Sequence, residues 1–320
     1  MSLPDAPPSR SSTRSSLLKL VVSVSAVALL LSQVDTERLA ATLGKIHGNT
    51  AIFVLLIYLS GQVVSARRWS VILGAAGFER SFGWVLRTYF GAMFFNLFAP
   101  ATFGGDAVRT YSLGREGSRH AAAMATVVFD RISGLAALCL LASVSMAVGG
   151  AQGWPEIVGW TAAALGFGLI LGPGWILPAF LTAVPAAQRL TERFRGPGRE
   201  LWSSVGLWTR CCAWSLTLHL HQIAAAWVLG QALGLGVPLA YYFVFHPLVI
   251  IFGALPISFA GFGVREMGYL WALTELRGVP AEAALAFGLA WSGLLVAASG
   301  FGGIVALFGG GDPNGPPPAE

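Results

Sequence analysis

Two charged, helix-breaking segments interrupt a chain whose remaining sequence is strongly apolar. The first segment runs from residue 96 to residue 109, and the second runs from residue 255 to residue 266. Each contains a proline, then glycines four or more residues later, then an acidic residue close to an arginine. Broken backbone and buried charge are both costly in lipid, because no water is there to satisfy them. Similar breaks in the two halves of a polytopic chain point to a transport site, so the pair predicts a polar cavity inside the membrane.

The composition favours a helical membrane protein and excludes a soluble globule. Hydrophobic residues make up 55% of the 320 residues and charged residues only 11%, with a mean hydropathy of +0.68. Soluble domains carry roughly 25% charged residues. The apolar runs are continuous and reach the ~18 residues of a membrane span, unlike the short alternating strands of a barrel. We therefore expect an all-α membrane protein. The expected spans are residues 17–34, 50–66, 121–148, 157–181, 207–233 and 282–308.

The two ends of the chain differ from this apolar region. Residues 1–16 are rich in Ser, Pro and Arg, which predicts a disordered N-terminal segment. Residues 309–320 are rich in Gly and Pro and predict a disordered tail. Residues 17–308 then form one transmembrane domain, and the chain has no other stretch of a size to make a soluble domain.

Basic residues lie beside the apolar runs, where they report orientation. The net charge is +5, from 20 Lys and Arg against 15 acidic residues. The loops at residues 150–156 and 234–238 carry no Lys or Arg, so the positive-inside rule places them outside and the basic stretches in the cytoplasm. Arg67 and Arg68 are interpreted here as cytoplasmic residues that follow the second span. The basic stretches are residues 10–19, 67–80, 109–119 and 189–199.

This charge pattern constrains how the two broken segments cross the membrane. It is consistent only if residues 82–109 enter from the cytoplasm and return there, and if residues 240–273 do the same from the opposite side. The expected architecture is therefore a polytopic helical bundle with two inverted, re-entrant broken-helix segments, as in secondary transporters. Both termini are expected in the cytoplasm and the protein in the cell inner (plasma) membrane. The alternative is that both segments span fully, which gives eight crossings and places residues 189–199 outside.

The residues of the breaks have distinct expected roles. Prolines end the incoming helices and glycines permit tight non-helical turns, which frees backbone amides that could bind an anion. Asp106 and Arg109 are three residues apart and share a face if they are helical. The competing interpretation of this pair is a surface ion pair in a cytoplasmic turn. The expected break-forming residues are Pro100, Gly104, Gly105, Pro256, Gly261 and Gly263.

Charged residues inside apolar sequence complete the candidate site. Asp130 and Arg131 lie within the third expected span and point about 100° apart on a helix, so each needs its own partner. Asp106, Arg109, Arg265 and Glu266 are the candidate partners. The group is interpreted either as an interhelical ionic lock or as the lining of a cavity. The expected headgroup or cavity residues are Asn96, Asp106, Arg109, Asp130, Arg131, Arg265 and Glu266.

The sequence offers little support for catalysis, a metal or a cofactor. His219 and His221 are two residues apart and face nearly opposite ways on a helix, unlike the spacing of a zinc helix. Ser258 sits in no nucleophile elbow, and no phosphate-binding loop or dinucleotide fingerprint occurs. The basic residues form no nucleic-acid-binding face. We expect no catalytic residue, no metal and no cofactor.

At these residues the chain resembles the lysylphosphatidylglycerol synthase transmembrane-region family of flippase-like integral membrane proteins. The resemblance covers residues 17–308 and implies a flippase-like transmembrane domain. In aminoacyl-phospholipid synthases of this kind a soluble aminoacyltransferase domain follows the membrane region, and these 320 residues contain none. The residues that carry the resemblance are Arg68, Trp69, Tyr89, Phe90, Gly91, Phe95, Asn96, Pro100, Gly104, Gly105, Asp106, Arg109, Asp130, Arg131, Gly134, Leu255, Pro256, Gly261, Phe262, Gly263, Arg265 and Glu266.

The expected function is therefore translocation of a lipid, without enzymatic activity. Arginines would attract the phosphate of an anionic or modified phospholipid, and the acidic residues would neutralise them in the empty site. The resemblance extends the candidate lipids to glycolipid and hopanoid-related molecules. The rival hypothesis is a non-transporting membrane partner that presents a lipid-linked intermediate to a glycosyltransferase or another lipid-modifying enzyme. An intramembrane transferase is disfavoured because the sequence shows neither a nucleophile nor a metal site.

Overall fold

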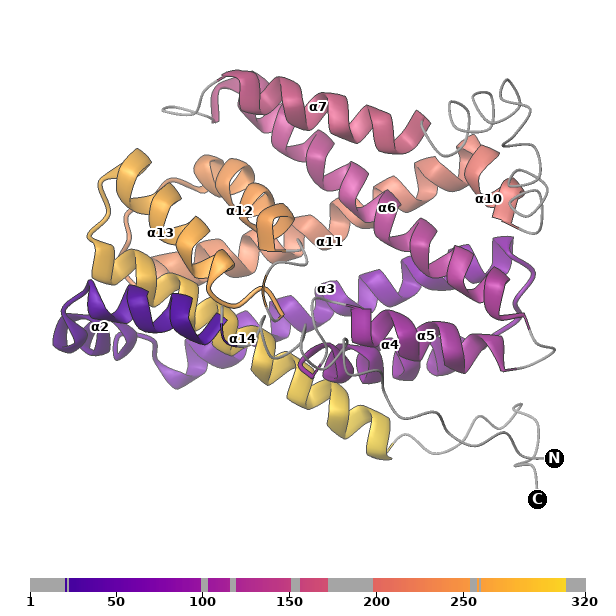
Figure 1. Ribbon diagram of the computed structural model, residues 1–320, viewed down its shortest axis with the longest axis horizontal. Helices are drawn as coiled ribbons and strands as arrows, with labels where there is room; N and C mark the ends of the chain where they lie inside the picture. The colour runs from indigo at the N-terminus through magenta and orange to yellow at the C-terminus, as the bar shows by residue number, and fades with distance from the viewer. Residues whose placement is uncertain are drawn as a thin grey trace.

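The computed structural model describes residues 21, 23–98, 103–115, 119–150, 156–171, 198–253, 258 and 260–308. Within these ranges every regular element is a helix, and the helices pack side by side into one bundle (Figure 1). The prediction of an all-α helical membrane bundle is confirmed. The prolines expected to break the helices, Pro100 and Pro256, lie outside the described residues.

Four long helices form the frame of the bundle: α3 (Gly48–Ala75), α6 (His120–Ser145), α11 (Val205–Ala232) and α14 (Ala281–Phe308). Within the described ranges, three helical stretches are long and apolar enough to cross a membrane, namely α3, His120–Val148 and α14. A helix of 28 residues, such as α3, α11 or α14, is about 42 Å long, which exceeds the ~30 Å hydrocarbon core of a bilayer.

Shorter helices surround this frame. An apolar helix at Ser23–Ser32 precedes α2 (Thr36–Leu43), whose first turn is capped by the Asp35 carboxylate. A short π-helix, η2 (Met146–Gly150), extends α6, and α7 (Glu156–Leu171) then packs back along α6. The six-residue helix α10 (Gly198–Ser203) leads into α11.

The two broken segments form two helical hairpins. The first consists of α4 (Phe82–Asn96) and α5 (Phe103–Gly114), and the second of α12 (Leu239–Gly253) and α13 (Val264–Arg277). Their helices of 12 to 15 residues are about 18–23 Å long, so each is shorter than the ~30 Å core. In Figure 1 the first hairpin extends inward from the side where α10 lies, and the second from the opposite side, where α2 lies. The hairpins therefore enter the bundle from opposite ends, and the assignment of those ends to the cytoplasmic and outer sides stays a prediction from the charge pattern.

Helix α14 packs against both hairpins. Near its C-terminal end, Gly302 and Gly303 lie against α4, where added Cβ atoms would collide with the Phe90 carbonyl and approach the Phe94 ring to 2.7 Å. Nearer its N-terminal end, Phe287 packs on Tyr269 of α13, with ring centroids 5.0 Å apart. Glycine thus permits the close crossing of α14 and α4, as small residues do in membrane bundles.

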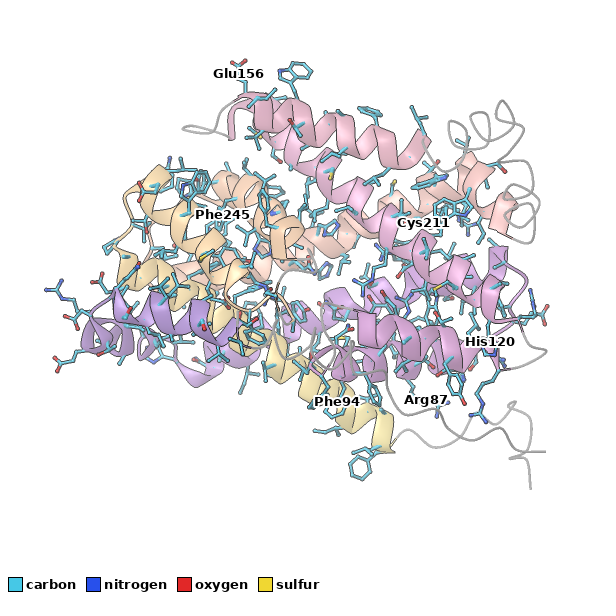
Figure 2. All side chains as sticks on the ribbon, in the orientation of Figure 1. Arg87, Phe94, His120, Glu156, Cys211 and Phe245 are labelled. Atoms are coloured by element: carbon cyan, nitrogen blue, oxygen red, sulfur yellow. The ribbon has the colours of Figure 1, made fainter. Side chains whose placement is uncertain are left out.

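The outer surface of the bundle carries large apolar side chains, which project from the helices in Figure 2. Trp160 on α7 is 72% exposed, and Leu307 and Phe308 at the end of α14 are 82% and 83% exposed. Apolar groups at such exposure fit contact with lipid tails better than contact with water.

The sidedness of the hairpins predicts the labelling of engineered cysteines. In a variant from which Cys139, Cys211 and Cys212 have been removed, Glu79→Cys lies before the first hairpin and Pro280→Cys lies after the second. Both positions are exposed. We expect an impermeant maleimide to label Glu79→Cys only from the cytoplasmic side and Pro280→Cys only from the outside of intact cells. Labelling of both from one side would contradict the inverted arrangement.

Candidate functional site

A buried ion-pair network lies where α3, α5 and α6 meet. Asp130 on α6 accepts a hydrogen bond from Arg68 Nε of α3 at 2.8 Å and another from Arg109 Nη2 of α5 at 2.8 Å. The three residues are 1%, 5% and 3% exposed. One carboxylate therefore joins two arginines from different helices, in a region from which most solvent is excluded.

A second aspartate extends the network toward the surface. Asp106 on α5 forms an ion pair with Arg131 Nε of α6 at 3.0 Å and lies 3.8 Å from Arg109 Nη1. The Arg131 side chain is 44% exposed, whereas that of Asp106 is 15% exposed. Three guanidinium groups face two carboxylates, so the network (Arg68, Asp106, Arg109, Asp130 and Arg131) has a surplus of one positive charge.

Arg109 is the residue in this network whose contacts are incomplete. Its guanidinium lies over the ring of Trp69 at 4.2 Å and near that of Tyr89 at 5.0 Å, both of which attract a cation. Tyr89 is held in turn by a 2.6 Å hydrogen bond to Ser65. Arg109 Nε is buried and has no hydrogen-bond partner among the residues that the structure describes. An unsatisfied buried donor on a surplus cation is suited to an anionic ligand.

Arg68 belongs to the site, although the sequence analysis ended the second span at residue 66 and interpreted Arg68 as a flanking residue; the structure shows that it is a buried residue inside a longer helix. Helix α3 continues to Ala75 instead of ending at residue 66, so Arg68 is an interior residue of the helix. Its Nη1 donates to Ser215 Oγ of α11 at 2.7 Å. Gly134 on α6 provides the room, since a Cβ there would lie 2.9 Å from Arg68 Nη1. One sequence feature did point to Arg68 and Gly134: both are among the residues that carry the family resemblance.

The first break is organised by Asn96, which lies at the end of α4. Its Oδ1 accepts a hydrogen bond from the backbone N–H of Gly105, in the first turn of α5, at 2.8 Å. This bond satisfies one of the amides that a helix start leaves free. Gly105 also packs directly on the Ala92 carbonyl of α4, where a Cβ would collide. Asn96 and Gly105 thus shape the hairpin, and they position the first turn of α5, which carries Asp106, with Arg109 one turn later.

This close approach gives a prediction for Gly105. We expect Gly105→Ala to lower the thermal stability of the purified protein, because the new methyl group collides with backbone and with Asn96 Oδ1. Gly83→Ala is the matched control on α4, since a Cβ at Gly83 meets nothing within 4 Å. There the change should be neutral or stabilising by roughly 0.5–1 kcal/mol through helix propensity. Equal melting temperatures for both variants would contradict the assigned role of Gly105.

The second break is closed by its own charged pair. Glu266 accepts from the backbone N–H of Gly263 at 2.6 Å, and also from Ser292 Oγ of α14. Arg265 donates to Ser292 Oγ at 3.2 Å and to the Ala260 carbonyl at 2.6 Å. Ala260, Gly261 and Gly263 have φ values of 50°, 82° and 84°, which favours glycine at the last two positions. Arg265 and Glu266 therefore hold a strained turn in place.

The structure brings together part of the predicted site. Asp106, Arg109, Asp130 and Arg131 form one network, and Asp130 and Arg131 have different main partners, as their angular separation predicts. Arg265 and Glu266 contact Ser292 and the second break, and their described contacts do not include that network. His219 Nε2 of α11 donates to the Gly134 carbonyl of α6 at 3.2 Å, and its Nδ1 lies 3.4 Å from Gln222 Oε1, so this histidine links two helices. Across the described ranges, His, Cys, Asp and Glu form no group of three that could hold a metal ion.

Comparison with known proteins agrees with the helical, apolar architecture. A family model described as the lysylphosphatidylglycerol synthase TM region matches residues 16–302. That match includes both hairpins and every residue of the ion-pair network. No curated protein matches the chain.

Proposed function

Because the chain belongs to the lysylphosphatidylglycerol synthase TM region family, a membrane domain associated with lipid-related functions, we propose that it translocates a phospholipid or lipid-linked headgroup between leaflets. The acyl tails of such a lipid can stay in the bilayer, so only the headgroup needs a polar path. A path of this kind needs polar groups at depth in the membrane that are supported by protein.

The observation that carries this proposal is the surplus positive charge beside the first break. Arg109 is 3% exposed, shares Asp130 with Arg68, and keeps Nε unsatisfied within the described part of the chain. A phosphate would neutralise the surplus charge and accept from that donor, and guanidinium suits phosphate geometry well. In this proposal Arg109 binds the headgroup phosphate, and Arg131, at 44% exposure, receives it from the surface.

The other polar residues then have supporting roles. Asp106 and Asp130 neutralise the arginines when the site is empty, and Asn96 fixes the turn that presents α5. Arg265 and Glu266 keep the second hairpin folded opposite the first. No covalent step is required of any of these groups. The proposal includes a multi-pass inner-membrane location with cytoplasmic termini, and anionic or modified phospholipid, glycolipid or hopanoid-related lipid as candidate substrates.

The deciding experiment separates translocation from binding. Purified protein is reconstituted into liposomes that carry fluorescent phosphatidylglycerol, and dithionite is added to bleach the outer leaflet. Translocation is expected to raise the bleached fraction above that of protein-free liposomes, which stays near one half. Specific lipid binding without any rise would favour the rival role, in which the protein presents a lipid-linked intermediate to a lipid-modifying enzyme.

A further inference from the structure

Three buried polar atoms in the aromatic part of the core lack a hydrogen-bond partner among the described residues. They are Tyr242 Oη and His246 Nε2 on α12 and Trp291 Nε1 on α14. The three residues are 0%, 1% and 0% exposed. Nearly all buried polar atoms in proteins are hydrogen-bonded, and an unpaired atom is especially costly at membrane depth. Three such atoms in one region indicate a bound group that satisfies them.

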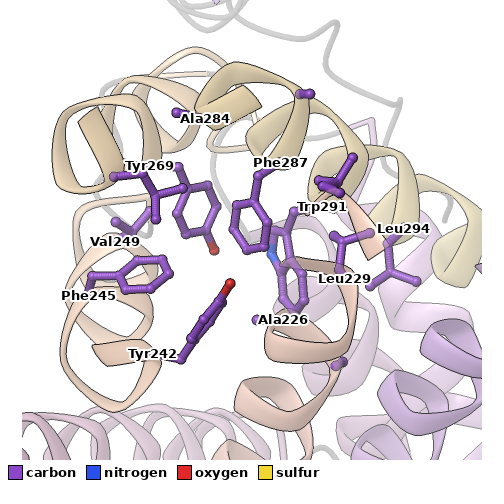
Figure 3. Packing of buried hydrophobic residues seen from close by; sticks show 14 of the residues in the cluster. Ala226, Leu229, Tyr242, Phe245, Val249, Tyr269, Ala284, Phe287, Trp291 and Leu294 are labelled. Atoms are coloured by element: carbon purple, nitrogen blue, oxygen red, sulfur yellow. The ribbon is translucent and has the colours of Figure 1, made fainter. Parts of the chain in front are cut away.

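The three residues are close neighbours. Tyr242 and His246 lie one turn apart on α12, and the rings of His246 and Trp291 have centroids 4.6 Å apart. Tyr242 and Tyr269 both pack on Phe287, at 6.1 Å and 5.0 Å. In Figure 3 the hydroxyls of Tyr242 and Tyr269 point toward one another, and the indole nitrogen of Trp291 faces the same space between the rings.

Their hydrogen-bonding chemistry specifies what is missing. The indole N–H of Trp291 can only donate. Tyr269 Oη lies 2.9 Å from His246 Nδ1, and this is the described partner of that hydroxyl. We assign Tyr269 as the donor in this bond, because the described residues offer its hydroxyl hydrogen no other acceptor, and a neutral His246 then carries its hydrogen on Nε2. The Tyr242 hydroxyl is a further available donor. All three atoms can offer hydrogens, and the described residues around them supply no acceptor.

We infer that Tyr242, His246 and Trp291 form a binding site for an uncharged oxygen acceptor. None of the three carries a charge, and the charges of nearby Arg265 and Glu266 are satisfied through Ser292, Ala260 and Gly263. The oxygen belongs either to a water molecule or to the ester carbonyl of a lipid. This donor site is separate from the ion-pair network, and it does not depend on translocation.

Whether Tyr242→Phe raises or lowers the melting temperature tests the inference. If the Tyr242 hydroxyl donates to a bound oxygen, Tyr242→Phe removes a hydrogen bond and lowers the melting temperature by about 2 °C. If the hydroxyl is unpaired, the same change relieves a buried polar group, and the melting temperature stays the same or rises. That second result would overturn the inference. Tyr269→Phe is the matched control, because it removes a hydroxyl whose partner is seen.

The source of the oxygen is distinguished by the surrounding lipid. The wild type and the two variants are compared in nanodiscs of diester phosphatidylglycerol and in nanodiscs of its diether analogue, which lacks ester carbonyls. A lowered melting temperature of Tyr242→Phe in both lipids assigns the oxygen to water. A lowered value in diester lipid alone assigns it to the ester carbonyl. No lowering in either lipid, while Tyr269→Phe is destabilised, would rule out the site.

Discussion

Replacing Asp130 with asparagine is expected to cause the largest loss of stability among the changes considered for this protein. Asp130 is 1% exposed and is the shared acceptor for Arg68 and Arg109, each at 2.8 Å. Asparagine keeps the shape but removes the charge, so two buried guanidinium groups are left beside each other with reduced compensation. Breaking a buried ion pair by removing one partner costs about 3–5 kcal/mol.

The measurement is the unfolding temperature of the detergent-purified variant, followed by loss of the monodisperse peak on size exclusion. Asp106→Asn is the matched control, because its partner Arg131 is 44% exposed and solvent screens that pair. We expect a clearly smaller decrease for the control. An Asp130→Asn protein as stable as the wild type would show that the network contributes little to folding.

Arg109→Ala is expected to abolish lipid translocation while most of the fold survives. The substitution removes the surplus charge and leaves two guanidinium groups facing two carboxylates, with the Arg68–Asp130 bond intact. The stability should therefore fall less than in Asp130→Asn. Lysine at this position keeps the charge but lacks the planar fork that suits phosphate, so Arg109→Lys should retain a reduced rate.

The dithionite assay measures both variants, with Arg87→Ala as the control on α4; among the described residues, the hydrogen bond of Arg87 is to the Gly83 carbonyl in its own helix. Arg265→Ala should also lose translocation, but with a lowered melting temperature, since Arg265 holds the second break through Ala260 and Ser292. Normal translocation by both alanine variants would remove the basis for the proposed site.

The sequence was most informative about features that cost the most free energy inside a membrane, namely charged side chains and broken helices. Charge and broken backbone in apolar sequence predicted both hairpins, their opposite entry, and the need of Asp130 and Arg131 for separate partners. The charge pattern did not reveal that Arg68 is buried, because an arginine that directly follows an apolar run is usually interpreted as a residue flanking a membrane span. Only the continuation of α3 to Ala75 and the room beside Gly134 reveal it as a buried residue.

Contacts between segments far apart in the chain could not be predicted from the sequence, for a different reason. Ser215 and Ser292 are ordinary helical serines by sequence, and both become partners of arginines only through the packing of α11 and α14. The same packing brings Tyr242 and His246 of α12 beside Trp291 of α14, where each keeps a buried polar atom without a partner among the described residues. Such roles depend on which helices meet, and no local periodicity encodes that choice.

Helix α14 meets the second hairpin at Ser292 and crosses the first at Gly302 and Gly303. About 15 Å of continuous helix separates the two contacts. Because α14 is one continuous helix that contacts both hairpins, a tilt or rotation of α14 that displaces one hairpin also displaces the other. We therefore expect the two hairpins to move together, with α14 coupling them, when the protein changes which side of the membrane can reach the site.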